Sequence, residues 1–155
     1  ELVLEHVLEN TGRQAIETDV YNHNFFVIDS QPTGPDFTVR FPFAPRADRE
    51  MKGYAEAGPS GIVFRREIPA GESVIALIDG WSPSETADHA FAIENRKTGA
   101  GVRMATDKPM SKLQFWAPRA TLCPEPYIEL RLKPGEADRW TTRYEFYTLD
   151  GVAGR

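Results

Sequence analysis

Hydrophobic and polar residues alternate along most of this chain with a period of two. The alternation begins at residues 1–9 and recurs at residues 37–41, where Phe37, Val39 and Phe41 are separated by polar residues. Successive side chains of a strand point to opposite faces, so this pattern is typical of half-buried β-strands. No stretch shows the sustained 3.6-residue period that would indicate an amphipathic helix.

Turn residues divide the alternating segments and set the expected strand boundaries. Asn10-Thr11-Gly12, Pro69-Ala70-Gly71-Glu72 and Lys133-Pro134-Gly135-Glu136 are typical turn sequences. Residues 42–60 are predicted to form a long loop with at most one helical turn near residues 47–57. Many short strands separated by turns predict an all-β antiparallel sandwich. The strands are expected at residues 1–9, 14–20, 24–29, 37–41, 62–67, 73–79, 89–95, 100–106, 111–117, 126–132 and 139–149.

Composition narrows the class of protein. The chain has 155 residues, 41% hydrophobic and 26% charged, which is typical of one globular domain. Its net charge of −5 argues against nucleic-acid binding, and no apolar run approaches the roughly 20 residues of a membrane-spanning helix. The single cysteine, Cys123, excludes an internal disulfide and a cysteine zinc site. The cellular compartment stays undetermined.

The chain begins at Glu1, inside patterned sequence. A strand that starts without a lead-in resembles a cut edge, so the sequence predicts a fragment of a longer chain. The edge at residues 1–9 is then expected to be open, or paired with a missing N-terminal half or with another chain.

Two aromatic-rich stretches contain the candidate chemistry. His23 lies within Tyr21-Asn22-His23-Asn24-Phe25-Phe26, and aromatic walls beside a titratable side chain suit a sugar site. A core histidine with satisfied hydrogen bonds is the alternative. His6 is expected to be a packed or surface residue. The dipeptide Asp88-His89 alone is weak evidence for a functional site, because such a pair is common.

Glu125 is the candidate base of the second stretch. It is expected in a stiff turn between Pro124 and Pro126, close to Gln114-Phe115-Trp116. Such a glutamate could act as a general base, or it could be an exposed turn residue. Asp88, Gln114 and Glu125 are too few and too varied to indicate a metal site, and the chain has neither a glycine-rich phosphate loop nor a Gly-x-Ser-x-Gly elbow.

Taken together, these stretches resemble the C-terminal half of the galactose mutarotase (aldose 1-epimerase) family. Each matching piece is short, but the pieces occur in the family's order along nearly the whole chain. They are Leu8-Glu9-Asn10-Thr11-Gly12, Asn22-His23-Asn24-Phe25-Phe26, Asp88-His89-Ala90-Phe91, Gln114-Phe115-Trp116, Cys123-Pro124-Glu125 and the closing segment 132–146.

The resemblance implies a partial antiparallel β-supersandwich and an epimerase that interconverts the anomers of a free or phosphorylated aldose without a cofactor or metal. It places His23 as the general acid that protonates the ring oxygen and Glu125 as the general base that takes the C1 hydroxyl proton. It places Asp88, Gln114 and Asn22 at sugar contacts.

The chain also departs from the family pattern. The segment with the family's second histidine has no counterpart, and Ala117-Pro118-Arg119 replaces a Thr-Gly step. A non-catalytic carbohydrate-binding module on the same sandwich is therefore the main alternative, and a scaffold without a sugar site is a third. The presence of both His23 and Glu125 favours the enzyme.

Overall fold

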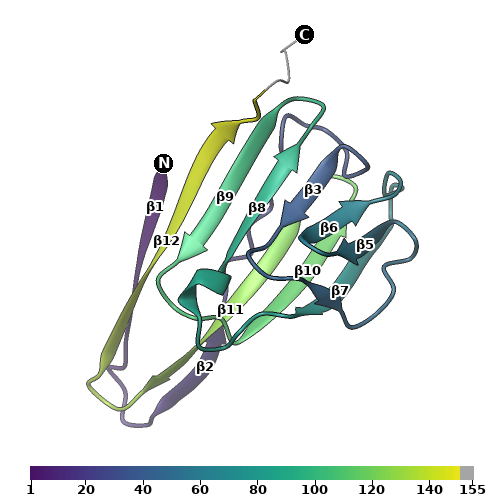
Figure 1. The fold of residues 1–155 in the computed structure, drawn as a ribbon. Coiled ribbons are helices and arrows are strands. Elements are labelled where there is room, and N and C mark those ends of the chain that lie inside the picture. Colours follow the sequence, from purple (N-terminus) through teal and green to yellow (C-terminus); the bar gives the residue numbers. More distant parts are fainter. Residues whose placement is uncertain (151–155) are drawn as a thin grey trace.

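The computed structural model describes residues 1–150, which form two antiparallel β-sheets and one short 3-10 helix, η1 (Thr86–Asp88) (Figure 1). No helix among these residues is long and apolar enough to cross a membrane. The strands are β1 (Leu2–Glu9), β2 (Ile16–Val20), β3 (Phe37–Arg40), β4 (Arg46–Ala47), β5 (Ala55–Gly58), β6 (Gly61–Phe64), β7 (Ser73–Asp79), β8 (Ala90–Asn95), β9 (Ala100–Thr106), β10 (Lys112–Pro118), β11 (Cys123–Leu132) and β12 (Ala137–Thr148).

The two sheets form the layers of a sandwich. One has seven strands in the order β1-β12-β9-β8-β3-β6-β5, and the other has five in the order β2-β11-β10-β7-β4. Every pairing is antiparallel, which confirms the predicted fold class. The strand β1 lies at one edge of the seven-stranded sheet, where an open edge was expected at residues 1–9.

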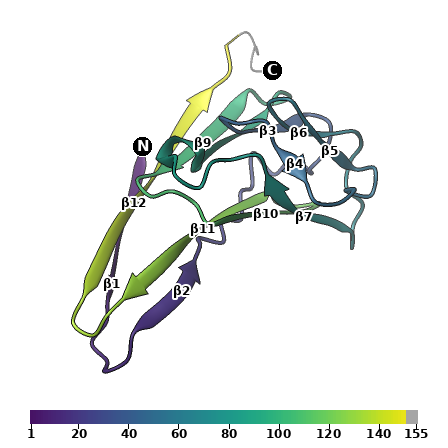
Figure 2. The same cartoon turned by 60° about the horizontal axis from the view of Figure 1, so that its bottom comes forward.

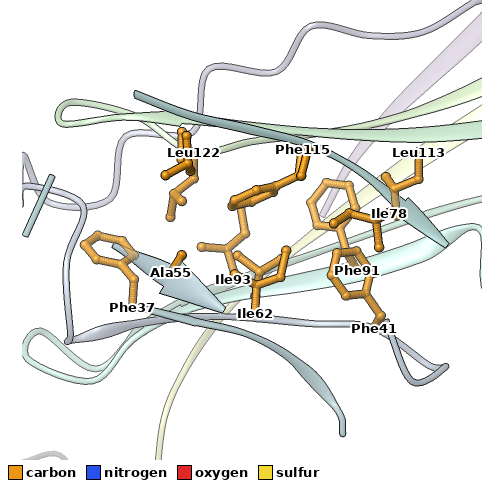
Figure 3. Packing of buried hydrophobic residues seen from close by; sticks show 14 of the residues in the cluster. Phe37, Phe41, Ala55, Ile62, Ile78, Phe91, Ile93, Leu113, Phe115 and Leu122 are labelled. Atoms are coloured by element: carbon orange, nitrogen blue, oxygen red, sulfur yellow. The ribbon is translucent and has the colours of Figure 1, made fainter. Parts of the chain in front are cut away.

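The main hydrophobic core lies between the sheets. On β10, Leu113, Phe115 and Ala117 are buried, while the residues between them are only half-buried. Figure 3 shows Phe115 on one side of this core and Ile93 of β8 on the other. The strict alternation on β10 gives the five-stranded sheet an outer face, opposite the core, on which Gln114 and Trp116 lie.

A second, smaller cluster fills the arm that β1, β2, β11 and β12 form beyond the main body (Figure 2). Ile128 and Leu130 of β11 pack there with Trp140 of β12. The His6 ring stacks on Trp140 with the ring centroids 4.9 Å apart. His6 is thus a packed residue, in agreement with its sequence interpretation.

The strand predicted at residues 24–29 is absent. This segment makes one isolated bridge, between Phe26 and Leu122, and its side chains still alternate, because Phe26 and Ile28 pack on the core while Phe25 and Val27 are exposed. The alternation of apolar and polar residues indicates which side chains are buried. A β-strand also requires a neighbouring strand with which its backbone groups can form hydrogen bonds. Here no such strand continues the bridge.

Residues 42–60, predicted to form a long loop with at most one helical turn, are not a continuous loop. Instead, β4 pairs with β7, and β5 pairs with β6. Lys52 and Gly53 have φ angles of 56° and 62°, in the left-handed region that interrupts a right-handed helical turn. The segment therefore turns sharply and returns as a strand.

Candidate functional site

The candidate site lies on the outer face of the five-stranded sheet, where β10 and β11 run side by side. Gln114 is directly opposite Glu125 in the ladder, and Trp116 is opposite Cys123. Directly opposite residues of an antiparallel pair share a face of the sheet. The segment that follows β2 adds His23 and Phe25 to this face.

Glu125 belongs to the strand β11 and is 1% exposed, so the predicted turn between Pro124 and Pro126 is wrong. Prolines lack the backbone donor that a central strand needs, and they are therefore found where a strand edge has no partner. The strand β2 pairs with β11 only from Ile128 onward. The edge of β11 at the two prolines is thus beyond the reach of β2, which explains why a strand can include them.

Two neighbours contact the Glu125 carboxyl group. Gln114 Nε2 donates a hydrogen bond of 2.9 Å to Oε2, and His23 Nδ1 lies 3.3 Å from Oε1. Oε1 is buried and makes no hydrogen bond, because the approach of His23 does not have hydrogen-bond geometry. Burial raises the pKa of the Glu125 carboxyl group, while the charge of His23 and the bond from Gln114 oppose that rise. Glu125 is therefore a stronger base than an exposed glutamate, with Oε2 hydrogen-bonded to Gln114 and Oε1 without a hydrogen bond.

Aromatic rings surround His23. Its imidazole stacks on Phe25 with centroids 4.1 Å apart and planes 12° apart, and the Trp116 ring lies nearly perpendicular to it with centroids 5.7 Å apart. The ring of Tyr21 stacks on Tyr127 at 4.2 Å. Phe25 is 59% exposed and His23 is 37% exposed. An exposed ring beside polar groups is a surface on which the C–H face of a sugar can stack.

In the structure His23 and Gln114 contact Glu125, whereas Asn22 and Asp88, the other two predicted sugar contacts, bond to other groups. The Asn22 amide lies 3.4 Å from His6 Nε2, and Asn22 lines a small cavity with His89 and Asn24. Asp88 lies in η1 and accepts a 2.7 Å hydrogen bond from the Ser82 backbone N–H. Within residues 1–150, no hydrogen bond or ion pair joins Asp88 or Asn22 to Glu125, and their roles remain predictions.

Cys123 is the residue of this site that the sequence interpretation left out. Its sulfur, one His23 nitrogen and one Glu125 oxygen lie within 4.8 Å of one another, a donor set that could hold a metal ion. Burial raises the pKa of the Cys123 thiol to about 11. The exclusion of a cysteine zinc site from the single cysteine was too broad, because one cysteine excludes a disulfide and a site made of several cysteines but not a site that combines it with histidine and glutamate. The available signal was the spacing of Cys123 and Glu125, two residues apart and hence on one face of a strand.

Comparison with known proteins supports the fold. No family model matches the chain, and neither does any curated protein. Among solved structures, a candidate aldose 1-epimerase from Escherichia coli K12 is similar with a TM-score of 0.64 and 15% identity, over 95% of this chain and 56% of that one. A galactose mutarotase-like protein from Clostridium acetobutylicum has a TM-score of 0.62 and 12% identity, over 95% and 52%.

The same architecture also occurs within a larger protein of another description. A TPR-domain containing protein from Parabacteroides distasonis is similar with a TM-score of 0.55 and 16% identity, over 96% of this chain and 28% of that one. The chain spans about half the length of the two mutarotase-like structures it matches. At these identities the likeness establishes a galactose mutarotase-like fold but not an activity, which has to be argued from the residues of the site.

Proposed function

We propose that this chain carries the acid–base pair of an aldose 1-epimerase-type isomerase. The observation that supports the proposal is the contact between His23 and Glu125. One carboxylate oxygen accepts a hydrogen bond from Gln114, and the other, 3.3 Å from His23 Nδ1, is buried and makes no hydrogen bond. The roles of the two residues follow from the family resemblance. The short distance between His23 and Glu125 suits ring opening, because the two oxygens that exchange protons, the C1 hydroxyl oxygen and the ring oxygen, are both bonded to C1.

The reaction needs one proton to leave and another to arrive. Glu125 takes the proton of the C1 hydroxyl group, the bond from C1 to the ring oxygen breaks, and His23 protonates that oxygen as C1 becomes an aldehyde carbon. Rotation about C1–C2 presents the other face of the aldehyde. The ring closes as His23 takes its proton back and Glu125 returns its proton to the former hydroxyl oxygen. Burial of Glu125 favours this role, since a base with a raised pKa accepts a proton more readily.

The surroundings of the pair suit a small polyol with apolar faces. Phe25 and Trp116 offer ring surface beside His23, while polar groups of the same face can bind hydroxyl groups. The binding-module alternative uses these rings without proton transfer. It therefore predicts sugar affinity that does not depend on Glu125 ionisation.

Polarimetry on freshly dissolved α-glucose, α-galactose and their 6-phosphates tests the proposal, with the protein expressed from its complete coding sequence. Glu125→Gln should lower the rate of anomer interconversion by about 10²–10⁴-fold and leave sugar affinity largely intact, because the amide keeps the shape but cannot take the proton. His23→Asn should also be slow. Glu129→Gln, on the same strand but exposed and paired with Arg131, is the matched control.

Two outcomes would contradict the proposal. Sugar binding without any acceleration of mutarotation in the unmutated protein would favour the binding module. Full activity of Glu125→Gln would place the base elsewhere.

A further inference from the structure

We propose that His23, Cys123 and Glu125 form a binding site for one zinc ion. The three side chains come from two parts of the chain, with Cys123 and Glu125 on β11 and His23 on the segment after β2. Binding of the ion does not depend on the proposed epimerase activity. Its effect on catalysis, described below, does rest on that proposed function.

The His23 and Glu125 donor atoms have the spacing that tetrahedral zinc requires. Zinc–nitrogen and zinc–oxygen bonds of about 2.0–2.1 Å place two tetrahedral ligands about 3.3–3.4 Å apart. His23 Nδ1 and Glu125 Oε1 are 3.3 Å apart, yet they do not form a hydrogen bond. The Cys123 sulfur lies within 4.8 Å of both. An approach of this sulfur to the ion would complete a three-ligand set.

A buried oxygen without a hydrogen bond also points to a cation. Glu125 is 1% exposed, and its Oε1 makes no hydrogen bond. A buried polar atom without a partner costs free energy that a bound ion would recover. The other oxygen, Oε2, accepts a bond from Gln114. Metal-ligating carboxylates are commonly oriented by such a bond.

The ligand types select the metal. A thiolate and an imidazole favour zinc, whereas magnesium and calcium prefer sites made of oxygen ligands alone. Zinc displaces the proton of the Cys123 thiol, which passes to the buffer. Three protein ligands leave a fourth position open, the arrangement of zinc sites that also bind water or a substrate oxygen.

Zinc at this site would compete with the proposed acid–base pair. The ion would occupy the oxygen of Glu125 and the nitrogen of His23 that face each other, so neither could exchange a proton with a sugar. We therefore expect zinc to inhibit mutarotation, and chelation to restore it.

Spectroscopic titration with Co²⁺ and calorimetric titration with Zn²⁺ test the site on the unmutated, metal-free protein. We expect one ion per chain, with a thiolate-to-cobalt charge-transfer absorption and the visible bands of tetrahedral cobalt, and no saturable binding of Mg²⁺. Cys123→Ser should remove the charge-transfer absorption and weaken zinc binding by at least about 100-fold, since even loss of an outer partner costs about 10–100-fold.

Control variants separate the site from other ligands and from misfolding. His23→Asn changes a partly exposed residue, so it should fold and still lose zinc affinity. His6→Asn should bind zinc like the unmutated protein, because His6 packs on Trp140 in the arm. Circular dichroism of each variant confirms folding before titration.

The outcomes are distinguishable from those of the epimerase test, because metal binding is measured without sugar. Absence of saturable cobalt binding, or equal zinc affinity in Cys123→Ser and the unmutated protein, would overturn the site even if the protein is an epimerase. Zinc binding in a protein without mutarotase activity would support the site while the proposed function fails. Zinc binding that leaves mutarotation unchanged would overturn the inhibition.

Discussion

Acidification should destabilise this fold through His89, a buried histidine at the start of β8. His89 is 3% exposed, and its Nδ1 lies 2.7 Å from the Lys108 carbonyl oxygen, so the neutral ring donates that hydrogen bond. Burial lowers the pKa of His89 from 6.5 to about 4, although the backbone bond and the Asp107 charge oppose the change. The folded chain therefore resists protonation that the unfolded chain accepts.

The direction and size of the effect follow from proton linkage. The unfolded state binds the extra proton between about pH 6.5 and pH 4, so stability that is present above this window is lost as the pH falls through it. At about 1.4 kcal/mol per pH unit, the loss from this one residue amounts to about 3 kcal/mol. That is a large fraction of the roughly 5–15 kcal/mol by which a typical domain is stable.

Urea unfolding at a series of pH values measures the effect. Carboxylates also titrate at low pH, so the quantity of interest is the difference in unfolding free energy between the unmutated protein and His89→Asn, whose amide can replace the donated bond to Lys108. We expect this difference to change by about 3 kcal/mol between about pH 7.5 and pH 4, in favour of His89→Asn at low pH. A difference that stays constant within about 0.5 kcal/mol would refute the reasoning, as would an NMR titration of His89 with an ordinary pKa.

Three further predictions concern the core and the site. Phe115→Ala should lower the unfolding free energy by about 3–5 kcal/mol in chemical denaturation, because the ring is fully buried between the sheets. The control Ile75→Ala, on the exposed face of β7, should change the unfolding free energy by less than about 1 kcal/mol. Trp116→Ala should weaken sugar binding by about 1–2 kcal/mol in calorimetry through lost ring contact; unchanged affinity would remove Trp116 from the proposed sugar surface. Gln114→Leu should lower the kcat of mutarotation more than it changes KM, since Gln114 holds the Glu125 carboxylate in place, and a pure change in KM would make Gln114 a sugar contact instead.

The arrangement of residues along the chain was sufficient to predict most strands. Strands such as β3, β7, β8 and β9 lie where alternation and turn residues predicted them, within one or two residues. The physical reason is that burial of every second side chain and the conformational preferences of turns are local properties. The resemblance of short motifs then indicated both the fold and the pair His23 and Glu125.

Where local pattern misled, a non-local partner decided the outcome. The alternating segment 24–29 has no continuous strand beside it, and Glu125 lies in a strand because β10 pairs with the proline-containing end of β11. Which backbone groups find partners depends on segments far away in sequence, whose pairing carries no local signature.

The order of residues was thus enough to predict a protein built of antiparallel strands and to mark His23 and Glu125 as candidates. The three-dimensional structure was needed to show that His23 Nδ1 lies 3.3 Å from Glu125 Oε1, that Gln114 donates a hydrogen bond to the same carboxyl group, and that the Cys123 sulfur lies within 4.8 Å of both ligand atoms. It also left Asp88 bonded to Ser82 rather than to this group. The reason is that periodicity fixes which face of a strand a side chain occupies, whereas the distance between residues remote in sequence is set by strand pairing and loop packing across the whole sandwich.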